Sequence, residues 1–124
     1  MQFNEYRIKI NIVLSPGIYL FDNQSALGKT WLFNEMRKHQ CEHEDIFTFT
    51  YNDLLLHHKF EIGDGIKICI LDRYDMYEGL FVNEIVEASS NCVILVDSKA
   101  LFSFTDNDKF CYITLTDGRI EVTE

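Results

Sequence analysis

Two short, almost uninterrupted apolar runs constrain the fold of this chain more than any other feature. The first covers residues 66–71 and the second covers residues 92–96. A strand that is apolar on both faces is typical of the middle of a parallel sheet covered by helices. Between the two runs, a helical stripe is formed by Tyr77, Leu80, Phe81, Ile85 and Ala88. The alternation of strands and helices therefore predicts an α/β fold.

Both ends of the chain carry the alternating pattern of half-exposed strands. Apolar and polar residues alternate over residues 6–14, and a Ser-Pro-Gly turn leads into a second strand over residues 18–21. Residues 110–123 form two short alternating runs around a Thr-Asp-Gly turn, which is a strong hairpin signal. We therefore expect an N-terminal and a C-terminal β-hairpin.

The segments between these ends predict the rest of the sheet and its helices. Helical spacing and a basic end indicate a helix over residues 30–39. Residues 46–51 predict a strand, and residues 52–60 predict a short helix capped by its first two residues. The apolar positions of the first helix are Trp31, Leu32 and Met36. The expected architecture is a three-layer, mostly parallel sheet that binds ligands at the carboxyl ends of its strands.

The length and charge of the chain limit its organisation and its partners. The 124 residues, of which 47% are hydrophobic, suffice for one core, so we expect a single domain over residues 1–124. The net charge is −9 and lysines and arginines form no cluster, which argues against direct nucleic-acid binding. An acidic surface can instead imitate nucleic acid towards a basic protein partner, although acidity commonly serves solubility alone.

The cysteines and the apolar segments indicate a cytoplasmic location. The four cysteines are widely spaced and form no C-x-x-C pair, and three of them lie in apolar runs, as expected of buried thiols in a reducing compartment. The first residues alternate in polarity, unlike a signal peptide. No apolar run approaches the ~20 residues that span a bilayer, so we expect no membrane association.

The most informative short motif is Gly28-Lys29-Thr30, which lies between an apolar strand and an amphipathic helix. Glycine there lets the backbone approach a phosphate group, and the free amides at a helix start bind anions. Lys29 would reach the β- and γ-phosphates, and Thr30 would offer a hydroxyl ligand to Mg²⁺. The alternative is a chance tripeptide at a helix start, where glycine and threonine are ordinary capping residues.

The segment 23–30 resembles the Walker A loop of the P-loop NTPases, G-x-x-x-x-G-K-[ST], at every position except the first. Asn23 stands where that pattern has glycine, and asparagine is one of the few other residues that tolerate a left-handed backbone. The resemblance implies ATP or GTP as the ligand, together with Mg²⁺. The nucleotide contacts that it implies in this loop are Asn23, Ser25, Ala26, Leu27, Gly28, Lys29 and Thr30.

A second motif supports the resemblance. The sequence KICILD ends in Asp72, directly after a buried strand, where the resemblance predicts a Walker B carboxylate. Such an aspartate holds Mg²⁺ directly or through water, so the resemblance makes Thr30 and Asp72 the metal residues. The alternative is a structural aspartate that ends a strand and caps the next helix.

The residues expected for catalysis are less complete than those expected for nucleotide binding. Many P-loop ATPases have a glutamate directly after the Walker B aspartate to polarise the attacking water, but this chain has Arg73 there. Asp75 could replace that base, or it could cap a helix that starts at Met76. The candidate catalytic residues are therefore Lys29, Asp72 and Asp75.

The strand over residues 93–96 ends in Asp97 and Ser98. P-loop ATPases with an inserted sheet strand carry a sensor there that touches the γ-phosphate, and the resemblance offers Asp97 or Ser98 for this role. Ser98 is our candidate nucleotide contact. A third carboxylate near a triphosphate would repel it unless a metal intervenes. Polar residues at strand ends are also common without any function.

The resemblance covers roughly residues 7–98 and describes a minimal core like those of ABC and AAA ATPases. The short interval between Lys29 and Asp72 leaves no room for an ABC helical subdomain, and neither an LSGGQ-like signature nor an AAA-type lid occurs. The function that the resemblance implies is nucleotide binding with weak or partner-dependent NTP hydrolysis. A partner protein or a second copy would then have to supply a catalytic arginine.

Two other functions remain open on the sequence. The first is a non-enzymatic regulator or inhibitor that retains the P-loop fold and binds a basic protein partner through its acidic surface. The missing first glycine, the missing glutamate and the short core favour it. The second is a small-molecule phosphotransferase, since such kinases share the loop, although the whole chain has only four arginines, at positions 7, 37, 73 and 119.

Overall fold

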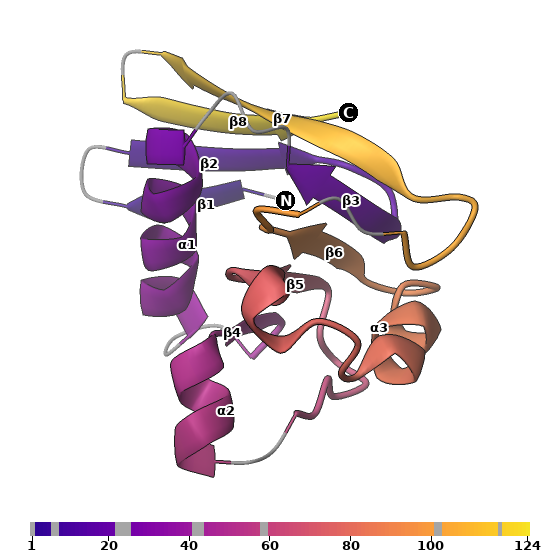
Figure 1. The fold of residues 1–124 in the computed structure, drawn as a ribbon. Helices are drawn as coiled ribbons and strands as arrows, with labels where there is room; N and C mark the ends of the chain where they lie inside the picture. The colour runs from indigo at the N-terminus through magenta and orange to yellow at the C-terminus, as the bar shows by residue number, and fades with distance from the viewer. Residues whose placement is uncertain are drawn as a thin grey trace.

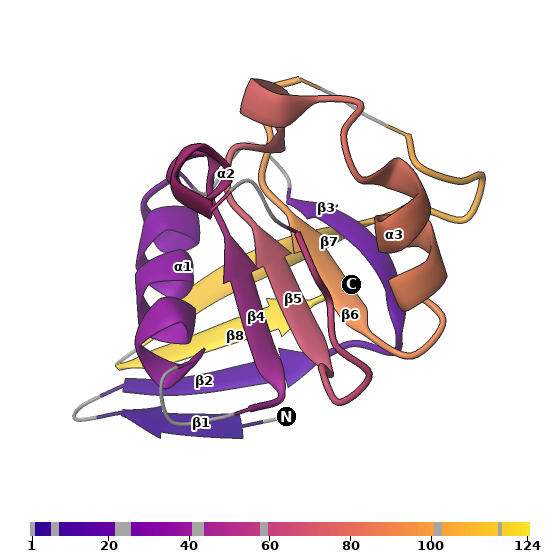
Figure 2. The same ribbon diagram turned by 90° about the horizontal axis from the view of Figure 1, so that it is seen from below.

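The computed structural model describes residues 2–5, 8–21, 26–40, 44–57, 60–100, 103–116 and 118–124. They form an α/β fold in which one sheet curls around a helix (Figure 1, Figure 2). The strands are β1 (Gln2–Glu5), β2 (Ile8–Val13), β3 (Gly17–Phe21), β4 (Ile46–Phe49), β5 (Ile68–Leu71), β6 (Val93–Val96), β7 (Lys109–Thr116) and β8 (Arg119–Thr123). The helices are α1 (Ala26–Gln40), α2 (Tyr51–His57), α3 (Val82–Ala88) and the 3₁₀ helix η1 (Tyr74–Tyr77).

The sheet has the strand order β1-β2-β8-β7-β3-β6-β5-β4. The run from β7 to β4 is parallel throughout, whereas β7 with β8 and β1 with β2 are antiparallel. Parallel neighbours require crossover connections, and α1, α2 and α3 lie on the connections between them. The mostly parallel α/β architecture expected from the sequence is therefore confirmed.

Two hydrophobic clusters lie on opposite faces of the parallel strands. Every residue of β5 and β6 is buried, as the two apolar runs predict. Side chains alternate between the faces, so that in β3 Tyr19 belongs to one cluster and Leu20 to the other. The first cluster includes Leu32 and Met36 of α1, and the second includes Ile85 of α3. Figure 2 shows α1 and α3 on opposite sides of these strands.

Helix α1 is enclosed by the curl of the sheet, because it packs against both β4 and β7. Leu32 and Met36 are fully buried as expected, but Trp31 is 45% exposed and does not belong to the core. A Cβ atom on Gly28 would lie 3.1 Å from the Ile113 Cγ2 atom of β7. The glycine therefore has a packing role, since it allows the start of α1 to approach β7 closely.

The expected N-terminal hairpin between strands 6–14 and 18–21 is wrong. Strand β2 pairs with β1 and β8, and β3 pairs with β6 and β7, so β8 and β7 separate the two strands. Strand β3 is buried along almost its whole length and has a parallel neighbour on each edge, so no edge remains for the antiparallel pairing of a hairpin. At the other end of the chain, β7 and β8 are antiparallel, with Thr116 opposite Arg119.

Two helix expectations also need correction. The stripe over residues 77–88 is not one helix, because η1 ends at Tyr77 and α3 begins only at Val82. Between them Gly79 has φ +83° and Phe81 has φ +61°, and both values interrupt a right-handed helix. In α2 the cap lies before the expected pair: Thr50 and Asp53 exchange backbone-to-side-chain hydrogen bonds of 2.9 and 3.1 Å, as in a capping box.

The structure also bears on the expectations for buried cysteines and for membrane-spanning segments. Cys69, Cys92 and Cys111 are free and buried, as expected, whereas Cys41 lies outside the described residues. Burial raises the pKa of Cys92 and of Cys111 to about 12, so both thiols stay protonated at neutral pH. Within the described ranges, no helix combines the length and apolar character needed to cross a bilayer.

Candidate functional site

Three charged side chains meet at the carboxyl ends of neighbouring parallel strands. Lys29 lies in the first turn of α1, which follows β3, while Asp72 directly follows β5 and Asp97 directly follows β6. The three strands end at the same level, because Val96 is the register partner of both Leu20 and Leu71. Residues that follow these strands are therefore brought to one edge of the sheet.

The central contact of the site is an ion pair between helix α1 and the end of β6. The Lys29 Nζ atom lies 3.1 Å from an Asp97 carboxylate oxygen. The two side chains are 14% and 15% exposed, so both are partly withdrawn from water. Attraction between unit charges at this distance is much stronger in such a place than at an open surface. The backbone of Asp97 is fixed as well, since its amide donates to Leu71 at 2.9 Å.

Asp72 lies beside this ion pair and is electrostatically strained. Burial raises its pKa to about 6, and the negative charge of Asp97 and a hydrogen bond between the two carboxyl groups add to the effect. The backbone holds the residue in place, because its amide donates to the Phe49 carbonyl at 2.9 Å and its carbonyl accepts from the Tyr77 hydroxyl at 3.2 Å. The fold therefore maintains two close carboxyl groups, of which Asp97 pairs with Lys29.

Asp75 is held away from a role as general base. Its carboxylate accepts hydrogen bonds from Arg73 Nε at 3.1 Å and Nη2 at 2.9 Å, and from the Lys99 amide at 3.1 Å. These bonds, chiefly the one from Arg73, lower its pKa to about 2. A carboxylate with such a pKa is a weak proton acceptor at neutral pH. It also caps no helix at Met76, since it lies inside η1 and Arg73 occupies the N-cap position with φ +48°.

The remaining candidate nucleotide contacts are placed unequally. Gly28 is buried in the first turn of α1 and Thr30 is exposed two residues later. Ser98 is 8% exposed, and its hydroxyl oxygen accepts from the Ala100 amide at 3.2 Å, so part of its capacity serves the local turn. Ala26 and Leu27 belong to α1, but their side chains are not described. Asn23 and Ser25 lie outside the described residues.

The side chains at the site have the type of ligand atom that a hard divalent cation prefers, but there are too few of them to hold the ion alone. Asp72 and Asp97 supply carboxylate oxygens, which Mg²⁺ prefers, and Mg²⁺ commonly keeps several waters and takes only one or two protein carboxylates. Across the described residues, no three His, Cys, Asp or Glu side chains are grouped closely enough to hold a metal ion. A metal at this site would therefore depend on ligands from water or from a bound phosphate group.

The sequence indicated where the site lies but not how its charges pair. Asp97 was expected as an alternative sensor, and in the structure it is the partner of Lys29. Arg73, which stands in place of a catalytic glutamate, neutralises Asp75 instead. Charged residues at the ends of two neighbouring apolar strands were the signal for both, but pairing depends on side-chain directions that the chain order does not contain.

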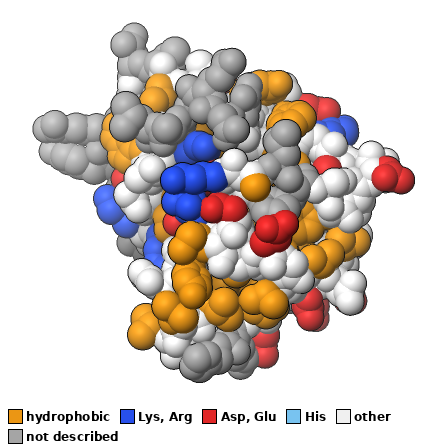
Figure 3. All heavy atoms as spheres, in the orientation of Figure 1, with side chains coloured by type: hydrophobic (Ala, Val, Ile, Leu, Met, Phe, Trp, Pro, Cys, Tyr) orange, Lys and Arg blue, Asp and Glu red, His pale blue; other side chains and the backbone are white. Residues whose placement is uncertain are grey.

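The face seen in Figure 3 carries both signs of charge. Lysine and arginine side chains lie against acidic ones near its centre, and hydrophobic side chains gather below them. In α2 and η1, the exposed large apolar residues are Leu55, Leu56 and Met76. The described residues of this face therefore do not form the continuous acidic surface that imitation of a nucleic acid requires.

The chain was also compared with known proteins. No protein-family model, no curated protein and no solved structure matched it.

Proposed function

We propose that the site formed by Lys29, Asp72 and Asp97 binds the phosphate groups of ATP or GTP together with Mg²⁺. The observation that carries the proposal is their convergence at the carboxyl ends of β3, β5 and β6, with Lys29 3.1 Å from Asp97. In open α/β sheets this edge is where ligands bind. The first turn of α1 adds amides without partners inside the helix, which favour an anion.

The strand order supports the same proposal. Strand β6 lies between β3, which precedes Gly28-Lys29-Thr30, and β5, which precedes Asp72. This is the arrangement expected from the resemblance to P-loop ATPases with an inserted strand, in which the inserted strand carries the sensor. The three-layer P-loop fold would then correspond to the parallel strands with α1 on one face and α3 on the other.

Lys29 serves two partners in the proposed function. Without nucleotide its ammonium group compensates Asp97, which in turn lies close to the Asp72 carboxyl group. Asp72, aided by Asp97, would hold Mg²⁺, which neutralises carboxylate and phosphate charge when bound. Lys29 is then released from Asp97 and turns to the phosphate oxygens. Binding is thus an exchange of cations at the two carboxylates, and the chain forms its own ion pair when the ligand is absent.

Hydrolysis is expected to be weak or dependent on a partner. Asp75 is engaged by Arg73, and this pairing also occupies the guanidinium group that lies closest in sequence to Asp72. Phosphoryl transfer relies on positive groups that stabilise the charge of the transition state, and an arginine from another protein commonly supplies one. We therefore propose that a partner protein or a second copy completes the site.

A second function, that of a non-catalytic regulator with a basic partner, is favoured by one observation. The lysine that should contact phosphate is already neutralised by Asp97 in the structure. If that ion pair persists in the presence of nucleotide, the site binds no phosphate and the protein acts through its surface. The same binding experiment separates the two functions.

Isothermal titration calorimetry with Mg-ATP and with Mg-GTP tests the proposal. Lys29→Ala should abolish the binding seen with the wild-type protein, because it removes the phosphate ligand. The control is Lys67→Ala, which removes an exposed lysine just before β5, at the opposite end of that strand from Asp72, and leaves the site intact. Absence of binding to the wild-type protein, or equal binding by the Lys29→Ala variant, would reject the nucleotide site and leave the regulator.

A further inference from the structure

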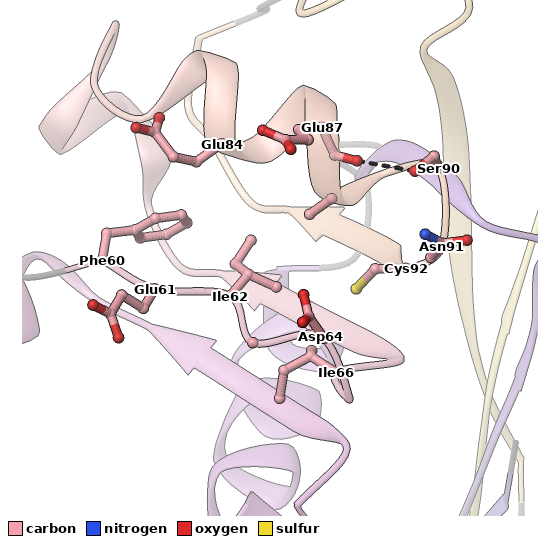
Figure 4. A pocket seen from close by; sticks show the side chains of 12 residues that line it. Phe60, Glu61, Ile62, Asp64, Ile66, Glu84, Glu87, Ser90, Asn91 and Cys92 are labelled. Carbon is pink, nitrogen blue, oxygen red and sulfur yellow. Dashed lines mark hydrogen bonds between the residues drawn. The ribbon is translucent and has the colours of Figure 1, made fainter.

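A hollow lies at the amino ends of β5 and β6, at the opposite edge of the sheet from Lys29 and Asp72. It is a cavity of 650 Å³, a size typical of ligand pockets (Figure 4). One wall is the segment 60–66, which leads into β5, and the other is α3 with the turn that leads into β6. Nothing in the proposed nucleotide site uses this cavity.

The inner lining of the cavity is apolar and firmly packed. Its apolar residues are Phe60, Ile62, Ile66, Ala88 and Cys92. Phe60 is only 8% exposed and stacks on Phe81 with ring centroids 4.5 Å apart. The Cys92 thiol has a pKa raised to about 12 by burial, so it acts as a neutral, apolar wall. The cavity can therefore accept an apolar group.

The rim of the cavity is acidic. Glu84 and Glu87 come from α3, and Asp64 comes from the opposite wall, as Figure 4 shows. All three side chains are exposed, and no described lysine or arginine pairs with any of them. No lining residue is basic. Carboxylates on facing walls without a compensating cation create a negative potential that attracts positive groups.

The spacing of these carboxylates selects the kind of cation. Within the described part of the chain, no three acidic, histidine or cysteine side chains are close enough to hold a metal ion. The rim therefore suits separate organic cations, each facing one carboxylate, rather than one metal ion. An apolar floor between separated acidic groups is complementary to an amphipathic chain with basic and apolar side chains.

We propose that this cavity binds a basic peptide segment of a partner protein. An aliphatic or aromatic side chain of the segment contacts Phe60 and Ile62, and flanking lysine or arginine side chains face Asp64, Glu84 and Glu87. A peptide fits better than a polyamine, because only a peptide places a large apolar group between its charges. This proposal is independent of nucleotide binding, since none of its residues belongs to the site at the other edge of the sheet.

Fluorescence anisotropy with a short labelled peptide of alternating lysine and phenylalanine tests the proposal. The test variant is Glu84→Gln with Glu87→Gln, which keeps side-chain size and removes two charges from the rim. The control variant is Glu78→Gln with Asp106→Asn, which removes two charges from exposed residues outside the cavity. At physiological ionic strength we expect the rim variant to bind roughly tenfold more weakly and the control variant to lose less than about twofold.

Two further probes make the outcome decisive. An all-lysine peptide and spermine should both bind at least about tenfold more weakly than the lysine-phenylalanine peptide, because neither fills the apolar floor. Lys29→Ala should leave peptide binding unchanged, which separates this site from the nucleotide site. Equal losses in the rim and control variants, or equal binding of all three cations, would show attraction to net charge alone and overturn the proposal.

Discussion

The two edges of the parallel sheet treat acidic side chains in opposite ways. At the carboxyl ends of β5 and β6, Asp72 and Asp97 are partly buried and Lys29 pairs with Asp97. At the amino ends of the same strands, Asp64, Glu84 and Glu87 are exposed and have no described basic partner. A buried carboxylate must be compensated within the fold, whereas an exposed one is compensated by water. In the proposed function the first edge exchanges its own cation for another, whereas the second edge can only gain one.

Removal of the cation from the first edge should have the largest effect on folding. Lys29→Ala leaves Asp97 and Asp72 close together without compensation, and should lower the free energy of unfolding by about 2 kcal/mol. Urea denaturation at neutral pH measures this change. Lys67→Ala should cost less than about 0.5 kcal/mol, because that side chain is exposed. Equal losses in the two variants would remove the contrast between the edges.

Removal of the strained carboxyl group should have the next largest effect, with the opposite sign. Asp72→Asn should raise the free energy of unfolding at pH 7 by about 1 to 2 kcal/mol, because ionised Asp72 is desolvated and repelled by Asp97. It should also weaken the binding of Mg-nucleotide, so stability and function move in opposite directions. A variant less stable than the wild-type protein would contradict the assignment of strain to Asp72.

The pH dependence of the wild-type protein follows from the same carboxyl group. Its pKa is raised from 3.8 in the unfolded chain to about 6 in the folded protein, so the folded state binds more protons between these values. The contribution of Asp72 to stability is therefore present below about pH 4 and lost as the pH rises through about 6. Denaturation curves between these values should show this loss in the wild-type protein and not in Asp72→Asn.

Asp75 sharpens the comparison within the first edge, because its pKa is shifted in the other direction. The Arg73 hydrogen bonds lower the pKa of Asp75 to about 2, so its stabilisation is present above pH 3.8 and lost as the pH falls through about 2. Asp75→Asn should cost about 0.5 to 1 kcal/mol at pH 7, by urea denaturation. The affinity for Mg-nucleotide should stay unchanged, since Asp75 is paired outside the proposed exchange. A large loss of affinity would restore Asp75 as a site residue.

The second edge should show the smallest effect on stability. Glu84→Gln with Glu87→Gln should change the free energy of unfolding by less than about 0.5 kcal/mol, because both side chains are exposed and unpaired in the described structure. The melting temperature, measured by circular dichroism, should match that of the wild-type protein. A clear rise in the free energy of unfolding would mean that repulsion between the carboxylates across the cavity destabilises the folded protein.

The sequence pattern predicted the strands and helices of this protein better than it predicted which strands lie side by side. Short apolar runs predicted the buried strands β5 and β6, and the basic residues Arg37 and Lys38 predicted where α1 ends. The separation of β2 from β3 by β8 and β7 depends on residues about 100 positions away, which a turn signal cannot contain. The break at Gly79 was hidden because the apolar spacing continues across it.

The sequence predicted the position of the candidate site, but it did not predict which of its charged side chains form ion pairs. Asp72 and Asp97 follow strands that the sequence placed in one sheet, so their shared edge was predictable. The contact of Lys29 with Asp97 depends on the position of the first turn of α1, where Gly28 packs closely against Ile113 of β7. The pairing of Arg73 with Asp75 depends on the left-handed backbone of Arg73, which is uncommon outside glycine.

The central claim is that Lys29 leaves Asp97 and Mg²⁺ joins Asp72 when Mg-nucleotide binds. It is tested most directly by carbon-detected NMR of the Asp72 side-chain carboxyl group. In the free protein its pKa should be about 6. With saturating Mg-ATP or Mg-GTP it should fall below about 4, because a divalent cation at the carboxylate favours the ionised form. A pKa of Asp72 that is the same with and without Mg-nucleotide would contradict the account.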